Sequence, residues 1–341
     1  MDYIRKINKQ GFAKRLYLQK KTIMNLSLLI ENLTSPALLF FILGIVAVKV
    51  KSDLEIPQNS SKFISLYLLL SIGFKGGQEL AHSQMDISIL WYVFFGFTIA
   101  IVIPLYCFFI LKNKLGIENA GAIAAAYGSV SAVTFVTAIS FLELQNIKFS
   151  GHMDAVMALM EAPAIIVGVI LISYFKKNNQ IKLNAIIVHS LTNGSVVLIL
   201  GSLIIGFLAS DTQAQSIKPF TTDLFKGFLM IFLLDMGITS GRKISEFIKN
   251  GWFTAIFAVI IPLFNGVVIA FLSQFVTSNI GDRFIFAILA ASASYIAVPA
   301  AMKIAVPKAN PGLYLPMALA ITFPFNITIG MPIYYMIITN L

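Results

Sequence analysis

Long runs of apolar residues, separated by short polar segments, dominate the sequence. A membrane-spanning helix needs about 20 mostly apolar residues to cross ~30 Å of hydrocarbon. Ten blocks approach or reach that length, and residues from Leu26 onward can extend the short first block. They lie near residues 36–50, 60–82, 86–111, 118–143, 150–175, 185–209, 220–240, 251–276, 283–306 and 313–339. Because apolar residues are continuous rather than alternating, a transmembrane β-barrel is excluded. The pattern predicts an all-α integral membrane protein with ten transmembrane helices.

Composition supports this fold class and excludes several functions. Of the 341 residues, 58% are hydrophobic and only 12% are charged, far from the balance of soluble domains. The net charge of +10 is attributed to the basic cytoplasmic loops of a protein that lies in a lipid bilayer, not to nucleic-acid binding. His82, His152 and His189 show no metal-ligand spacing, and Cys107 is read as a small buried residue. No nucleophile–base set is visible, so an enzyme is not expected.

The distribution of basic residues predicts the orientation in the membrane. Beyond residue 23, the loops after odd-numbered blocks carry 13 Lys and Arg, whereas those after even-numbered blocks carry 5. The positive-inside rule then places both termini outside the cell (inner) membrane. Residues 1–23 carry seven basic residues and contradict this arrangement. Either Met24 is the natural start, which we favour, or the segment lies on the membrane surface as a basic amphipathic extension.

The two halves of the sequence resemble each other at an offset of about 160 residues. The matched pairs are FILGIV (41–46) with LILGSL (198–203), IGFKGG (72–77) with MGITSG (236–241), IPLY (103–106) with IPLF (261–264), AIAAAYGSVSAVTF (122–135) with AILAASASYIAVPA (287–300), and MALMEAPAIIVG (157–168) with MALAITFPFNITIG (317–330). We expect a first five-helix repeat over 24–175, a short cytoplasmic linker over 176–184 and a second repeat over 185–341. An odd number of helices inverts the second repeat, as in many secondary transporters.

The fourth block of each repeat carries the candidate site. Small and hydroxyl residues fill 127–134 and 292–299, and Pro299 removes a backbone donor in the second segment. We expect both helices to be broken there and to cross near the membrane centre. Half-helix N-termini would then face an anion, and exposed carbonyl groups would face a cation. A tight helix–helix seam is the alternative for either segment alone, but the matched positions favour a site.

Four motifs give the chain a resemblance to the sodium-dependent bicarbonate permeases known from cyanobacteria. They are GFKGG (73–77), YGSVS (127–131), MEAPA (160–164) and IAVPKANP (304–311), and the resemblance extends from about Ser35 to Ile338. It implies two inverted repeats, with a gate domain from spans 1, 2, 6 and 7 and a core domain from the rest. It also implies a homotrimer that moves bicarbonate together with sodium.

The resemblance and the hydroxyl pattern together define the expected site. Substrate-binding candidates are Gly128, Ser129, Ser131, Thr134, Ser292, Ser294 and Tyr295, and cation-coupling candidates are Glu161, Asn326 and Ser294. Several positions depart from the family pattern. Tyr295 stands where the family has an aspartate, and Val133, Ala293, Ala297 and Val298 replace hydroxyl or glycine positions. These changes predict altered ion coupling.

Other charged residues within the blocks have separate expected roles. Asp235 either caps a break before Gly237 or titrates, whereas Asp154 and Glu143 are expected near span ends, facing water. Lys75 is expected to extend outward toward the interface. Glu161, beside Pro163 in a repeat-matched motif, is the strongest functional candidate among the acids.

The sequence therefore predicts a secondary active transporter for a small inorganic anion or carboxylate, with Na⁺ as the possible coupling ion and no other cofactor. Two alternatives remain open. One is a proton-coupled transporter, or one for a different small carboxylate; the other is a transport-inactive sensor or scaffold with the same fold. Because the linker between the repeats is short, a soluble regulatory partner docking there is not expected.

Overall fold

The computed structural model describes residues 34–82, 88–176, 194–247 and 251–341, with the isolated positions Ile30, Val188 and Thr192. The predictions for residues 1–23, for His189 and for nearly all of the linker 176–184 lie outside the described residues. Every regular element in the described ranges is helical, and these ranges contain no strand. The prediction of an all-α fold is confirmed.

Each of the ten apolar blocks contains helix where it is described. The first half of the chain forms α2 (Pro36–Lys49), α3 (Gln58–His82), α4 (Ser88–Leu115), α5 (Ile117–Gly128), α6 (Ala132–Leu144) and α7 (His152–Lys176). The second half forms α9 (Gly194–Leu208), α10 (Asp211–Lys218), α11 (Phe225–Phe247), α12 (Trp252–Leu272), α13 (Ile280–Ala291) and α14 (Ala297–Ala305). It ends with α15 (Pro311–Pro316), α16 (Phe323–Phe325) and α17 (Met331–Thr339), which π-helical turns join into one long rod.

Six helical segments among the described residues are long and apolar enough to cross a membrane. They are Ile89–Leu115, Ile117–Leu144, His152–Lys176, Asp211–Ile244, Trp252–Phe275 and Pro311–Thr339. Two shorter apolar helices are α2 and α9. The outer face of α12 shows what surrounds these segments, because Trp252, Ile256, Ile260 and Phe264 follow one another at four-residue spacing and each is more than half exposed. Such a stripe fits a lipid exterior, and the chain is a multi-pass membrane protein.

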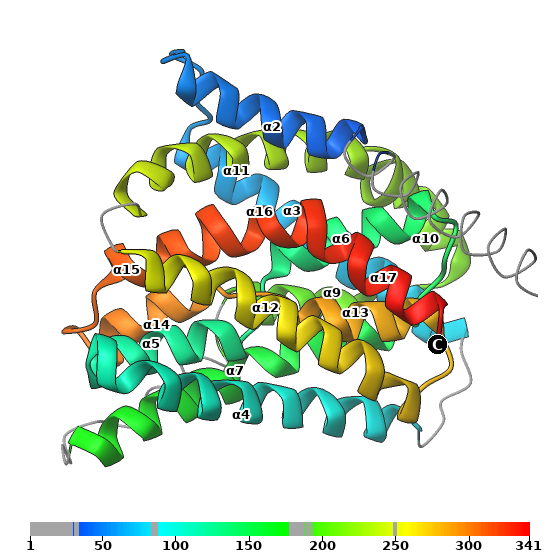
Figure 1. The fold of residues 1–341 in the computed structure, drawn as a ribbon. Helices are drawn as coiled ribbons and strands as arrows, with labels where there is room; N and C mark the ends of the chain where they lie inside the picture. The colour runs from blue at the N-terminus through cyan, green and yellow to red at the C-terminus, as the bar shows by residue number, and fades with distance from the viewer. Residues whose placement is uncertain are drawn as a thin grey trace, which may run out of the picture.

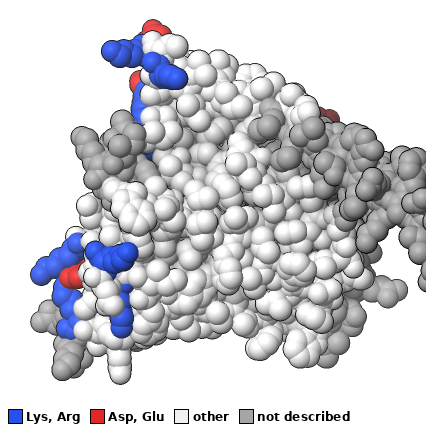
Figure 2. Space-filling view, in the orientation of Figure 1, with Lys and Arg blue, Asp and Glu red and all other residues white. Residues whose placement is uncertain are grey.

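The surface charge agrees with that environment. Figure 2 shows Lys and Arg gathered at the left edge of one face, while the rest of the described surface in that view carries few charged residues. Charged side chains in hydrocarbon are costly, so their scarcity over the middle of this face is the expected arrangement for helices that lie within a bilayer.

Two pairs of helices from opposite halves pack closely at glycines. On one side α2 lies along α11 (Figure 1), where a Cβ at either Gly44 or Gly237 would collide with the backbone of the facing helix. On the other side α3 packs along α9, where Gly77 and Gly206 meet the facing backbone in the same way. Small residues allow this close approach between membrane helices. Each pair joins the first apolar block of one sequence repeat to the second apolar block of the other.

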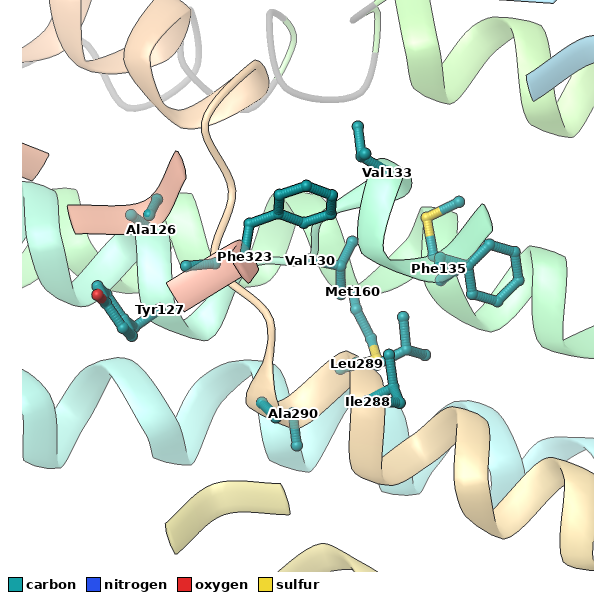
Figure 3. Close-up of a cluster of buried hydrophobic side chains, with 14 of the residues drawn as sticks. Ala126, Tyr127, Val130, Val133, Phe135, Met160, Ile288, Leu289, Ala290 and Phe323 are labelled. Atoms are coloured by element: carbon teal, nitrogen blue, oxygen red, sulfur yellow. The ribbon is translucent and has the colours of Figure 1, made fainter. Parts of the chain in front are cut away.

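The interrupted helices form the centre of the molecule. In the apolar 18-residue window of Ile117–Leu144, 94% is buried, and every residue of α13 after Ile280 is buried. Figure 3 shows the shared cluster, in which Ala126, Tyr127 and Val130 of the first half contribute with Leu289 and Ala290 of the second half. The core is therefore built around the two segments that the sequence marked as the candidate site.

Candidate functional site

The first predicted break lies between α5 and α6. Helix α5 ends at Gly128, three residues are not helical, and α6 begins at Ala132. The side chain of Ser131 caps the second half-helix by accepting a hydrogen bond from the Thr134 N–H group at 3.2 Å. Serine favours this position because its hydroxyl oxygen satisfies a backbone donor that the helix itself leaves free. The predicted interruption is confirmed.

The second predicted break lies between α13 and α14 and is longer. Helix α13 ends at Ala291, and α14 begins only at Ala297. The hydroxyl oxygen of Ser294 accepts a hydrogen bond from the Val298 N–H group at 3.5 Å, so a serine again supports the start of a half-helix. Pro299 occupies the first turn of α14, where the absence of its N–H group has no consequence. This interruption is confirmed as well.

The two breaks contact each other directly. The Ser131 N–H group donates to the Ser292 hydroxyl oxygen at 3.0 Å, and the Ser294 N–H group donates to the Ala126 carbonyl oxygen at 2.8 Å. All four residues are buried. Unwound backbone inside a membrane protein requires such partners, because no water is present to supply them. The breaks therefore join the two halves of the chain through polar backbone groups.

Several of the predicted site residues have a packing or capping role at this junction. Gly128 lies against Pro104 of α4, and a Cβ at position 128 would collide with the proline ring. The Ser129 hydroxyl group donates to the backbone carbonyl oxygen of Glu161 at 3.5 Å, which ties the first break to α7. Thr134 is buried, with its N–H group held by Ser131.

Glu161 lies beside the junction, at a small internal cavity of about 10 Å³. The lining residues are Val130, Ser131, Ala132, Glu161, Ser195, Ser294, Tyr295 and Ile296. A cavity of this volume holds no more than about one water molecule. The structure thus gathers Ser131, Glu161, Ser294 and Tyr295, from three separate segments, around one small cavity.

Asn326 has a different environment. Its side chain is fully buried, and its amide nitrogen donates to the Ala291 carbonyl oxygen at 2.7 Å, where α13 ends. The Tyr334 hydroxyl group donates to its amide oxygen at 3.4 Å. Asn326 is not among the residues that line the cavity at Glu161. It therefore supports the end of a half-helix.

A larger cavity of about 870 Å³ opens on the other side of Tyr295. Tyr295 and Ile296 of the second break form part of its wall, and Lys62, Arg242 and Lys243 also line it. Tyr295, half-buried, thus borders both the open cavity and the internal one. No local sequence signal marks the three basic residues as neighbours, because they come from the beginning of α3 and the end of α11.

Asp235 belongs to the same large cavity, and one of its two predicted roles is wrong. Helix α11 continues without a break through Gly237, because that glycine packs against Phe41 and Gly44 of α2 rather than ending the helix. Asp235 therefore caps no break. Its carboxylate accepts a hydrogen bond from the Ser61 hydroxyl group of α3.

A second large cavity of about 690 Å³ lies at the opposite end of α3. Lys75 and Glu143 line it and form an ion pair at 3.5 Å. The expectation that Asp154 faces water is wrong, because only 1% of this residue is exposed. Its carboxylate lies against Gly76 of α3, which has no side chain to keep it out. The neighbour that buries Asp154 is remote in sequence, so the position of Asp154 near a span end does not reveal its burial.

Two interrupted helices meet at their breaks, and a cavity lies at each end of α3. These features define the class to which the protein belongs. This is the arrangement of membrane transporters whose sites lie between discontinuous helices. The sequence comparison agrees: residues 36–339 match the model of the Na⁺-dependent bicarbonate transporter superfamily. The chain belongs to that superfamily. No curated protein matches it by sequence.

Proposed function

We propose that the chain is a secondary active transporter for a small anion, with bicarbonate as the first candidate, and that the anion is bound where the broken helices meet. One observation carries this proposal. Helices α6 and α14 begin at Ala132 and Ala297, so both of their N-termini lie where the two breaks meet. A cavity lined by three basic residues lies next to this junction. Helix N-termini and basic side chains both favour an anion.

The proposed architecture is ten spans in two inverted repeats, in the inner membrane and with both termini outside. Helices α6 and α14 begin at positions that the repeat alignment makes equivalent, Ala132 and Ala297. In the same alignment α2 corresponds to α9 and α3 to α11. The packed pair α2–α11 is therefore equivalent to the packed pair α9–α3. Both facts are expected if one unit occurs twice in opposite orientations.

Tyr295 is the proposed barrier on the substrate path. It separates the open cavity from the internal space at Glu161, and that space is too small for an anion of several atoms. We therefore propose that an anion from the open cavity reaches the junction only after the Tyr295 ring moves. The phenol group donates to the Met236 sulfur at 3.7 Å, a weak contact that opposes such movement little.

Coupling to sodium is proposed to be weak or absent. A tyrosine hydroxyl group is neutral near neutral pH and offers one donor with acceptor capacity, whereas the family has a carboxylate at position 295. Sodium would then depend on carbonyl and serine oxygens, with Glu161 as the only acidic side chain among the described residues that line the internal cavity. Hard cations prefer several oxygen ligands that include carboxylates, so this set should bind Na⁺ poorly.

Proton coupling is the second candidate, and the state of Glu161 favours it. The residue is 8% exposed, and its carboxylate makes no hydrogen bond within the described residues. A buried carboxyl group without a partner is more stable neutral than ionised. Such a group can carry a proton across during transport. A transport-inactive sensor or scaffold with the same fold is the outcome if neither ion supports uptake.

The test is uptake of labelled bicarbonate by proteoliposomes that contain the full chain. Uptake is compared under a sodium gradient, a proton gradient, both and neither, with protein-free vesicles as control. We expect uptake with a weak dependence on sodium. Other small carboxylates are offered as competitors, and their effect identifies the substrate class. Absence of uptake under every gradient and of any competitor effect would refute the transport proposal.

A substituted protein tests the proposed cause of the weak sodium coupling. Tyr295→Asp, combined with Ala297→Ser and Val298→Gly, restores the carboxylate, hydroxyl and glycine of the family pattern. The triple variant is expected to increase sodium-dependent uptake relative to the unaltered protein. If the unaltered chain already shows steep sodium dependence and the triple variant changes nothing, the cation does not bind at this junction.

A further inference from the structure

The second large cavity contains an unexplained concentration of buried polar atoms. Five side-chain nitrogen or oxygen atoms in the described residues are buried without a hydrogen-bond partner, and three of them belong to residues of this cavity. They are both carboxylate oxygens of Asp154 and the Nε2 atom of His152. Because buried polar atoms nearly always have partners, each exception calls for a physical explanation.

Asp154 occupies the first turn of α7, where its carboxylate is enclosed by neighbouring backbone. Gly76 of α3 leaves the space for one carboxylate oxygen, and the Gly151 carbonyl oxygen accepts a hydrogen bond from the Asp154 N–H group at 3.3 Å. The position near a helix N-terminus stabilises a negative charge to a small extent. That contribution is much smaller than the cost of burying an ionised carboxylate with no hydrogen bonds.

The surroundings of Asp154 favour a proton over a metal cation as the group that neutralises it. Lys75 and Lys148 line the same cavity and balance the charges of Glu79 and Glu143, so these four side chains leave no excess negative charge to attract a metal cation. No group of three or more His, Cys, Asp or Glu residues in the described part of the chain is placed to hold a metal ion. A proton needs only the carboxylate, and a neutral carboxyl group is tolerated where an ion is not.

Apart from His152, whose Nε2 atom is buried without a partner, the other titratable groups that face the cavity have partners or remain near water. Lys75 pairs with Glu143, and the Asp282 carboxylate accepts hydrogen bonds from Tyr92 and Ser150. The titratable residues around Asp154 are Lys75, Glu79 and His82 of α3, Tyr92 of α4, Glu143 of α6, Lys148 of the following loop, His152 of α7 and Asp282 of α13. Glu79 is exposed. Asp154 is thus distinguished from the other acids by burial without partners.

We propose that Asp154 is a proton-binding site served by the second cavity. Asp154 and Glu161 are seven residues apart, so they lie on the same side of α7 and about 10 Å apart along its axis. One helix therefore carries a buried acid at each of two separate cavities. This assignment is independent of the anion that the protein moves and of whether Glu161 takes part in coupling.

The test is infrared spectroscopy of the full chain in lipid bilayers, titrated between about pH 5 and about pH 9. A protonated carboxyl group has a carbonyl band that an ionised carboxylate lacks. We expect the unaltered protein to show such a band near neutral pH, and Asp154→Asn to lose one component of it. Glu143→Gln is the matched control, because Glu143 lines the same cavity but is paired with Lys75, and this variant is expected to retain the full band.

Two results would overturn the proposal. One is a band that is identical in Asp154→Asn and the unaltered protein at every pH. The other is a component assigned to Asp154 that disappears when sodium chloride, but not choline chloride, is added at constant pH, since this would indicate a metal-cation site. If Asp154→Asn does not fold, the Glu161→Gln protein decides, because it removes the other buried acid without a partner: a remaining band near neutral pH supports the proposal, and its absence overturns it.

Discussion

The hydrogen bond between the two helix breaks allows a quantitative prediction. Ser292→Ala removes the hydroxyl oxygen that accepts from the Ser131 N–H group at 3.0 Å. Both residues are at most 3% exposed, so water cannot replace the lost partner. An unsatisfied buried donor costs about 1–3 kcal/mol. The Leu289 carbonyl oxygen, which also loses a bond to Ser292, keeps the bond from the Ser292 N–H group at 3.3 Å.

Ser240→Ala is the matched control for this substitution. Ser240 is fully buried, and its hydroxyl group donates to the Leu319 carbonyl oxygen at 2.9 Å. Its removal takes away a hydrogen bond without leaving a buried N–H group unpaired. A single intramolecular hydrogen bond contributes about 0.5–1.5 kcal/mol net. We therefore expect Ser292→Ala to destabilise the protein by about 1 kcal/mol more than Ser240→Ala does.

Equilibrium unfolding of the detergent-solubilised protein measures both variants, and the uptake assay is run on the same preparations. We expect Ser292→Ala to reduce uptake more than Ser240→Ala, because only the former loosens the junction of the breaks. Equal losses of unfolding free energy in the two variants would show that the Ser131–Ser292 bond carries no special weight. The account of the junction as the structural centre of the site would then be refuted.

Two further predictions concern the acids and the glycines. Glu161→Gln is expected to impair uptake or ion binding more than Asp235→Asn does. Glu161 lies at the internal cavity, whereas Asp235 lies at the open cavity and has Ser61 as a partner. Equal or reversed effects of the two substitutions would contradict this prediction. Gly237→Ala is expected to destabilise the fold by about 1–3 kcal/mol through overpacking against the α2 backbone. Gly201→Ala places its methyl group in open space and should be nearly neutral in thermal unfolding. Similar shifts in the unfolding temperature of both variants would contradict this prediction.

The helix breaks were predictable because their cause is local. Small residues, hydroxyl groups and a proline within an apolar block weaken a helix wherever the block lies, and the same composition occurs at equivalent positions of both repeats. The structure ends α5 at Gly128 and α13 at Ala291, within or beside the expected segments. The ten predicted spans do not each correspond to a long helix, because α2 and α9 are short in the described residues.

The environment of the acids was not predictable, because it depends on partners remote in sequence. Asp154 is buried by Gly76, which comes from a helix that precedes it by more than one span. Asp235 is held by Ser61, 174 positions away in the sequence. A position within an apolar block indicates that an acid lies at membrane depth, but only the packing of other helices determines whether it has a partner. The ability of a buried acid to bind an ion or a proton depends on whether it has such a partner.

The difference between the two breaks explains why the open cavity meets the site on one side. The second half-helices begin at equivalent positions, but α13 ends earlier in the repeat register than α5. The second break therefore has five non-helical residues, Ser292–Ile296, whereas the first has three, Ser129–Ser131. The longer break carries Tyr295 and Ile296 to the wall of the open cavity, which no residue of the shorter break reaches. The second break thus differs from the first by two additional unwound residues, and substitutions in 292–296 should change access from the open cavity more than substitutions in 129–131.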